Sequence, residues 1–209
     1  MNSLWIIAGI VVLGLLARRF LRLAIAYVLG KSIGASALAK QPDAIHLEVA
    51  GADAWRDRAR ADRSADALLA RDFVDAGTWT LREMPGVLVR LLVSRPASLT
   101  AAVYEHPKAG AWCDVYYHFT DGVSATFTSA APTGLDPRPG HAVVHRPGGE
   151  ATALLDLALD HQSLVAPLPV SVEDAPRRFE SAYAQALAWR KTNGISRQEV
   201  VNVAQKRAA

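Results

Sequence analysis

The sequence is poor in cysteine, because Cys113 is the only one among its 209 residues. A single cysteine excludes a disulfide within the chain and a zinc site built from several thiolates. The sequence also lacks a GxxxxGK(S/T) phosphate loop and a GxGxxG dinucleotide motif. We therefore expect no metal and no cofactor, and the fold has to be stabilised by its own hydrophobic core.

Acidic side chains are missing from residues 1–40. Five of the 23 Lys and Arg lie in this segment, whereas all 20 Asp and Glu lie beyond it. The basic pI of about 9.2 therefore arises from the N-terminal segment, and residues 41–209 are slightly acidic. A nucleic-acid-binding domain carries a basic stripe on its folded part. We expect no nucleic-acid partner.

Charge is also absent from the first 17 residues, and residues 4–17 (LWIIAGIVVLGLLA) are almost wholly apolar. As an α-helix, 17 residues extend about 25 Å, the short end of what crosses a bilayer. Basic residues follow this run and none precedes it, so the positive-inside rule puts the N-terminus outside and the domain in the cytoplasm. We expect a single-pass protein of the inner (cytoplasmic) membrane. The expected anchor residues are Trp5, Arg18, Arg19 and Arg22.

A second interpretation of the same segment is export through a cleaved signal. Residues 18–22 (RRFLR) resemble a twin-arginine motif, and residues 37–39 (ALA) resemble a cleavage site. The long neutral run before the arginines is not typical of such a signal, so the uncleaved anchor is favoured. We divide the chain into an anchor with a juxtamembrane helix (1–34), a linker (35–52) and a cytoplasmic domain (53–209).

The first part of the domain shows the pattern of β-strands. Between residues 77 and 130 the apolar residues alternate with a period of two, and Pro or Gly turns separate the runs. Short loops predict an antiparallel meander of about five to six strands. The expected strands are Thr78–Met84, Val87–Ser94, Leu99–Glu105, Trp112–Phe119, Val123–Ser129 and His141–Arg146.

The hairpin around Asp121-Gly122 has the strongest turn signal. A two-residue Asp-Gly loop is typical of a primed β-turn. Pairing the strands around it places Asp114 and Tyr116 on the same face as Ala125 and Phe127. Neither face of this hairpin is then cleanly polar, so we expect both to be partly covered, one by helices and one by a partner, a membrane surface or a ligand.

Helical patterns flank the strands. We expect helices over residues 53–71 and 150–161, a third that begins near Asp174 and ends at Gly194, and a last one that starts with a capping box between Ser196 and Glu199. The fold class is therefore α+β: an N-terminal transmembrane helix, a helix, the meander and C-terminal helices. This order resembles the helix-grip folds, which cradle apolar ligands.

Candidate chemistry gathers on the strands. Glu105 and His106 end one strand, and Asp114 and His118 lie on the next, so a hairpin could bring a carboxylate near an imidazole for acid–base work. His141 and His145 have the HxxxH spacing of metal sites. On a strand, however, residues four apart are separated by about 13 Å, too far to share one metal ion.

These observations favour a membrane-anchored, non-enzymatic binding or scaffolding domain whose partner is another membrane or cytoplasmic protein. One alternative is a domain that binds a lipid or another apolar ligand near the bilayer. A second alternative is a hydrolase-like enzyme that uses Glu105, His106, Asp114 and His118. The run from Ala102 to Trp112 is similar in style to bacterial membrane-anchored proteins, and that resemblance implies no mechanism.

Overall fold

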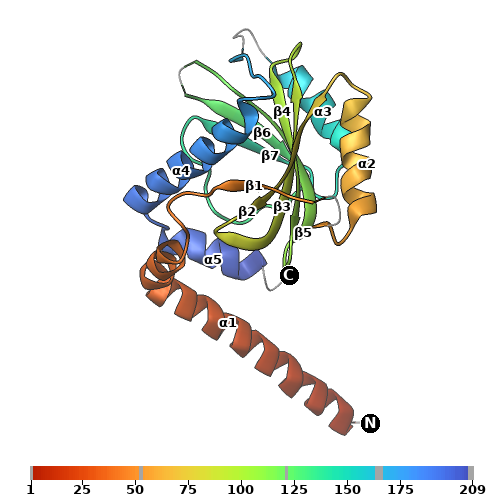
Figure 1. Cartoon of the computed structure of the whole chain (residues 1–209). Coiled ribbons are helices and arrows are strands. Elements are labelled where there is room, and N and C mark those ends of the chain that lie inside the picture. Colours follow the sequence, from red (N-terminus) through yellow and green to blue (C-terminus); the bar gives the residue numbers. More distant parts are fainter. Residues whose placement is uncertain (1, 52–53, 121, 163–166, 207–209) are drawn as a thin grey trace. The chain divides into compact units, whose positions relative to one another are not determined.

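The computed structural model describes residues 2–51, 54–120, 122–162 and 167–206, and it leaves out the side chains of residues 2–17, 19, 22 and 23. The chain forms two compact units. One contains Met1–Gln41, Thr133–Asp136 and Arg190–Ala209, and the other contains Pro42–Pro132 and Pro137–Trp189. The sheet belongs to the second unit (Figure 1).

A seven-stranded sheet with its strands in chain order forms the centre of the second unit. Its strands are β1 (Leu47–Val49), β2 (Val74–Leu81), β3 (Met84–Ser94), β4 (Leu99–His106), β5 (Gly110–His118), β6 (Ser124–Thr128) and β7 (His141–His145). All neighbours up to β6 are antiparallel, and β7 joins β6 in parallel.

The α+β class is therefore confirmed, whereas the expected meander of five to six antiparallel strands is wrong in number and in its last pairing. The segment between β6 and β7, residues 129–140, carries the chain back to the end of the sheet where β6 begins. A strand that restarts from that end runs parallel to its neighbour, and such a return needs a long connection. Sequence alternation marks a strand but not its direction.

The hairpin between β5 and β6 is also different from expectation. His118 pairs with Ser124, and the Phe119 N–H donates to the Val123 carbonyl at 2.8 Å. The loop therefore has three residues rather than two, with Gly122 at a φ of 79° that suits glycine. A change of one residue turns every β6 side chain to the other face. Thr126, not Phe127, is consequently the cross-strand partner of Tyr116.

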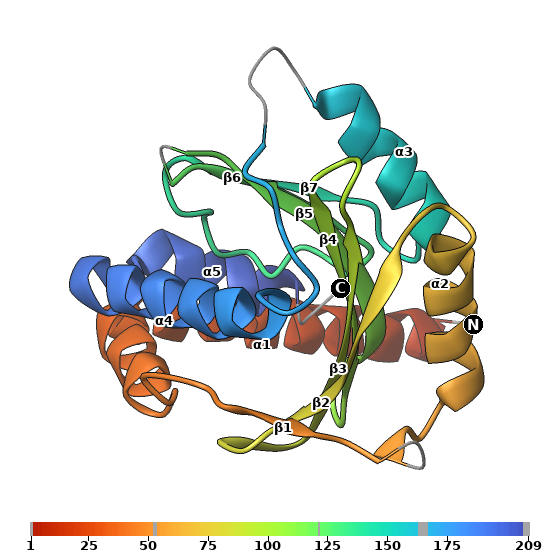
Figure 2. The same cartoon turned by 45° about the horizontal axis from the view of Figure 1, so that its top comes forward.

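One face of the sheet is covered by α2 (Arg58–Leu69) and α3 (Ala151–His161), as Figure 2 shows. Asp57 caps α2 through the Arg60 N–H at 3.1 Å, so this helix begins five residues later than expected. The core between these layers is apolar and fully buried. Its largest side chains include Leu68, Leu92, Val115, Phe127 and Leu154.

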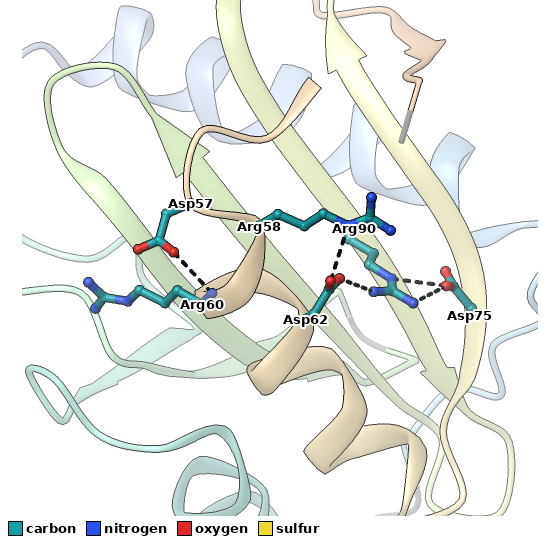
Figure 3. A network of polar contacts seen from close by, with 6 residues as sticks. All are labelled: Asp57, Arg58, Arg60, Asp62, Asp75 and Arg90. Carbon is teal, nitrogen blue, oxygen red and sulfur yellow. Dashed lines mark hydrogen bonds and ion pairs between the residues drawn. The ribbon is translucent and has the colours of Figure 1, made fainter. Parts of the chain in front are cut away.

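An ion-pair network attaches α2 to the sheet (Figure 3). The Arg90 guanidinium on β3 donates to Asp75 on β2 at 2.6 Å and to Asp62 on α2 at 3.3 Å. The Arg90 side chain is 17% exposed, whereas both carboxylates are near 40% exposed. The charged residues of this helix are therefore not all solvated, because Asp62 contacts the sheet.

The other face of the sheet is covered by α4 (Ala175–Asn193), which lies opposite α2 and α3 in Figure 2. Phe179 and Tyr183 pack against apolar residues of β2 and β3, and the Tyr183 hydroxyl donates to the Pro42 carbonyl at 3.1 Å. The expected cap is present, since the Asp174 N–H donates to Ser171 Oγ at 3.1 Å. Gly194, at a φ of 74°, follows the end of the helix as predicted.

The first unit contains α1 (Asn2–Ala39) and α5 (Arg197–Lys206). The predicted capping box is confirmed, because Ser196 Oγ accepts from the Glu199 N–H at 3.1 Å and Glu199 Oε2 accepts from the Ser196 N–H at 2.8 Å. α1 continues five residues into the expected linker. Its buried Gly34 lies against Ile195, where an added Cβ would be 2.9 Å from the Ile195 Cβ.

Among the described side chains, no helix is both long and apolar enough to cross a bilayer. The expected span and its anchors Trp5, Arg19 and Arg22 lie outside the side chains that the structure describes. Arg18 is exposed on α1.

Candidate ligand-binding cavity

A cavity of about 760 Å³ lies between the sheet and α4. Its floor is formed by the cavity-facing side chains of β4 to β7, and its roof by one side of α4. Alanines at positions 182 and 186 line the roof. An alanine side chain ends at Cβ, so this part of the helix leaves the space below it unfilled. Every lining residue belongs to the second unit.

Aromatic rings form the middle of the cavity. Tyr104 on β4 stacks on Trp112 on β5, with ring centroids 4.6 Å apart and planes 14° from parallel. Phe179 on α4 lies 6.1 Å from the Tyr104 ring in a tilted arrangement. The register explains the stack, because Tyr104 and Trp112 are direct cross-strand partners. The rings offer broad apolar surface to a ligand.

One buried carboxyl group interrupts this apolar lining. Asp114 lines the cavity, and its Oδ1 atom is fully buried with no hydrogen-bond partner among the described residues. Burial raises the pKa of Asp114 to about 6, although the nearby Thr128, Trp112 and Tyr104 side chains favour the carboxylate. Protein atoms enclose this oxygen, and a buried oxygen without a partner is held at a cost to folding.

Two histidines lie at one end of the cavity. His118 on β5 and His141 on β7 are both partners of Ser124 on β6, which separates them. Ser124 Oγ is 2.6 Å from His141 Nδ1. Burial lowers the pKa of His118, and the nearby charges of His141 and Arg178 lower it further. Burial and Arg138 likewise lower the pKa of His141. These shifts favour the neutral form of both imidazoles.

The four candidate acid–base residues are not brought together. Glu105 is on the opposite face of the sheet, where its carboxylate accepts from the backbone N–H groups of Arg56 and Asp57 at 2.8 and 2.9 Å. His106 pairs with Gly110, four residues along β5 from Asp114 and eight from His118. These spacings correspond to about 13 and 27 Å. The three cavity residues therefore lie along the floor rather than around one point.

Other residues singled out in the sequence have structural contacts. His145 Nδ1 is 3.0 Å from the Ala130 carbonyl, and the strand assignment of residues 141–145 separates its ring from His141. Among the described residues, no group of three potential ligands can hold a metal ion. Cys113 is buried in the core, and burial raises the pKa of its thiol.

A serine with GxSxG spacing, Ser32 between Gly30 and Gly34, lies within helix α1. The nucleophile elbow of serine hydrolases needs a sharp strand-to-helix turn at the serine. The middle of a helix does not supply it, so this spacing carries no catalytic meaning here.

The cavity itself is the feature that sequence patterns do not locate. Periodicity predicts the stripe of Phe179 and Tyr183 on α4. Nothing in the sequence distinguishes Ala182 and Ala186, which line the cavity, from ordinary helix-forming alanines. The one available signal is that neither face of the predicted hairpin around Asp121-Gly122 is cleanly polar, which indicates that both faces are partly covered. In the observed register, Ser124 and Thr126 both line the cavity.

Comparison with known proteins adds no relative from which a role could be transferred. No protein-family model, no curated protein and no solved structure matches this chain.

Proposed function

We propose that the domain binds an apolar or amphipathic small molecule in the cavity between the sheet and α4. The supporting observation is the cavity of about 760 Å³ with an aromatic floor and a mostly apolar lining surface. Ligand pockets occupy about 300–1,000 Å³ and combine mostly apolar walls with a small number of polar groups. The separation of Glu105, His106, Asp114 and His118 supports binding rather than hydrolysis.

The proposal is tested with N-phenyl-1-naphthylamine, a neutral apolar dye that becomes fluorescent in apolar sites. The full chain is kept in solution by an amphipathic polymer, because detergent monomers would compete for the cavity. We expect saturable binding of one dye per chain above a polymer-only blank. In the double variant Ala182→Phe/Ala186→Phe, the new rings fill the roof of the cavity, and binding weakens by about tenfold or more, at least ~1.4 kcal/mol.

The matched control is Ala188→Phe on the same helix, because Ala188 is exposed and does not line the cavity. This variant is expected to bind the dye as the native chain does. Equal binding by the double variant would place the dye elsewhere and contradict the proposal.

We also propose that the N-terminal apolar segment anchors the domain to the inner membrane, with the domain on the cytoplasmic side. The support is the uncharged run of residues 1–17 followed by arginines. Reporters fused before Trp5 and after Ala209 test this topology. Activity of a cytoplasm-specific reporter only at the C-terminal fusion agrees with it, and a mature chain that begins near Lys40 contradicts it.

A role in binding another membrane or cytoplasmic protein stays a prediction. Affinity capture from solubilised membranes should then return a stoichiometric partner, and repeated blanks would count against it.

A further inference from the structure

Two arginines lie at the histidine end of the cavity. Arg178 extends from α4, and Arg138 from the segment before β7, and both side chains line the cavity and are half-buried. Neither forms an ion pair or a side-chain hydrogen bond with another described residue. A third arginine that lines the cavity, Arg177, is exposed and pairs with Asp174 at 2.7 Å. Arg138 and Arg178 therefore have no direct ion-pair partner among the described residues, although the Asp174 carboxylate is near enough for the charge of Arg178 to help lower its pKa.

The charges of these arginines reach the two histidines. Apart from burial, Arg178 contributes to the lowered pKa of His118, and Arg138 to that of His141. The four side chains are thus near neighbours although they come from three separate segments. Neutral imidazoles can still donate a ring N–H to an anion.

Acidic groups are scarce in the cavity lining. Among the described residues that line the cavity, Asp114 is the only one with a carboxyl group. It lies four residues from His118 on β5, about 13 Å along the strand. Half-buried cations without a counter-charge are costly, and a bound anion offsets that cost. The planar guanidinium matches carboxylate and phosphate oxygens two at a time.

Most of the remaining lining surface is apolar, although Asp114 and His106 also belong to it. The cavity extends past Trp112, which lies six residues from His118 on the same strand, about 20 Å away. Its far part is lined by Ile45, Leu81, Met84 and Val87. A ligand that fills the whole cavity therefore needs an acidic group at one end and an apolar chain at the other.

We propose that the cavity binds a single-chain amphipathic anion, with its carboxylate or phosphate head between Arg138 and Arg178 and its apolar tail along Tyr104, Trp112 and Phe179. This inference rests on the proposed function and specifies the class of ligand for the same cavity. It makes Arg138 and Arg178 the residues that distinguish an acid from a neutral molecule with the same tail.

The test measures displacement of N-phenyl-1-naphthylamine from the full chain by ligands with identical tails. Tetradecanoate and tetradecyl phosphate carry a charged head, and tetradecanol does not. We expect at least one of the two anions to displace the dye with an apparent dissociation constant about tenfold lower than that of the alcohol. The reason is that charged hydrogen bonds add to the same apolar contact. Which anion displaces it better identifies the head group.

The variant Arg138→Gln/Arg178→Gln should keep the far-ultraviolet circular dichroism spectrum of the native chain, which shows that it is folded. Its affinity for the preferred anion should fall to that for the alcohol. The control variant Arg95→Gln/Arg146→Gln removes two exposed arginines that do not line the cavity, and thus the same net charge. It should keep the preference for the anion.

Each other outcome contradicts a distinct statement. Equal displacement by the anions and the alcohol overturns the head-group inference and leaves the apolar cavity intact. Loss of the preference in both double variants means that overall charge, not the cluster, attracts the anion. Displacement of the dye by inorganic phosphate as strongly as by tetradecyl phosphate removes the need for a tail. Absence of dye binding overturns the proposed function itself.

Discussion

Charged side chains in this protein have very different environments. Glu105 is buried, and backbone N–H groups of the segment before α2 satisfy its carboxylate. Arg90 is nearly buried between two carboxylates. Asp114, by contrast, has an oxygen without a partner. A group that is held at a cost to folding, inside a cavity, is typical of a binding site rather than of a structural core.

Replacing Asp114 should therefore stabilise the protein. Its pKa is raised from 3.8 to about 6 on folding, so the folded state holds the proton more tightly and stability falls as the pH rises from 3.8 to about 6. Asp114→Asn lacks this loss, and its free energy of unfolding at pH 7.5 should exceed that of the native chain by up to about 3 kcal/mol.

Urea unfolding between pH 4 and 8 measures this difference. Asp156→Asn is the control, because Asp156 is exposed and pairs only with Arg71 at the surface. If the difference in unfolding free energy between Asp114→Asn and the native chain does not change with pH, burial does not raise the pKa of Asp114.

Replacing Arg90 by Met should destabilise the protein by about 1–3 kcal/mol, because Asp62 and Asp75 lose their shared partner. The loss stays below that of a fully buried pair, since both carboxylates reach solvent. Arg58→Met removes only an exposed pair with Asp62 and should change stability by less than about 0.5 kcal/mol. Equal effects of the two substitutions in chemical unfolding would assign no special role to Arg90.

Small residues on the helices set how closely neighbouring segments approach them. On α4, alanines leave room for a cavity. On α1, Gly30 and Gly34 admit the backbone and side chains of Arg197 and Ile195.

Glu199 stabilises the start of α5. Burial alone would raise the pKa of Glu199, but the N–H groups of Ser196 and Asp136 together with Arg190 outweigh burial and lower this pKa. This contribution is lost only in acid, as the pH falls through the lowered pKa.

Gly34→Leu should separate α5 from α1. Even an ideal Cβ at this position is 2.9 Å from the Ile195 Cβ, closer than carbon atoms approach, and a leucine adds three more carbons. We expect hydrogen exchange of the α5 amides to become about tenfold faster or more, because α5 is short for an isolated helix. Ala35→Leu, at an exposed position of the same helix, should leave the exchange rates unchanged. Equal protection in the two variants would contradict this packing.

The sheet, α2, α3 and α4 pack together so that one sheet face is filled and the other is filled only in part. The filled face has the tightly packed core under α2 and α3. The other face has α4 above the cavity. Ligands bind preferentially where a fold leaves a concave, mostly apolar space, so the asymmetry of the two faces supports the proposed binding role.

Ligand binding should consequently stabilise the whole chain against unfolding. At a free ligand concentration one hundred times the dissociation constant, the expected gain is about 2.7 kcal/mol. Thermal unfolding with and without the preferred ligand measures it as a higher Tm. The variant Ala182→Phe/Ala186→Phe should show a much smaller shift at the same concentration. A similar shift in both proteins would indicate binding outside the cavity.

Much of the local structure could be read from the residues because its causes are local. The capping box of Ser196 and Glu199, the end of α4 at Gly194 and the alternation of β2 to β7 all depend on neighbours within a few positions. Less of the candidate site could be predicted from the sequence. Asp114 and His118 were singled out and both line the cavity, but Arg138, Arg178 and the alanines of α4 have no local signature.

The sequence by itself determined the α+β class, the approximate extent of most helices and strands, and the helix caps, since propensity, periodicity and capping act over a few residues. Only the tertiary structure decided the direction of β7, the face on which Thr126 lies, the burial of Arg90 and the cavity under α4. Those features depend on the length of one loop and on which distant segments meet, and non-local packing of this kind leaves no pattern in any short stretch of chain.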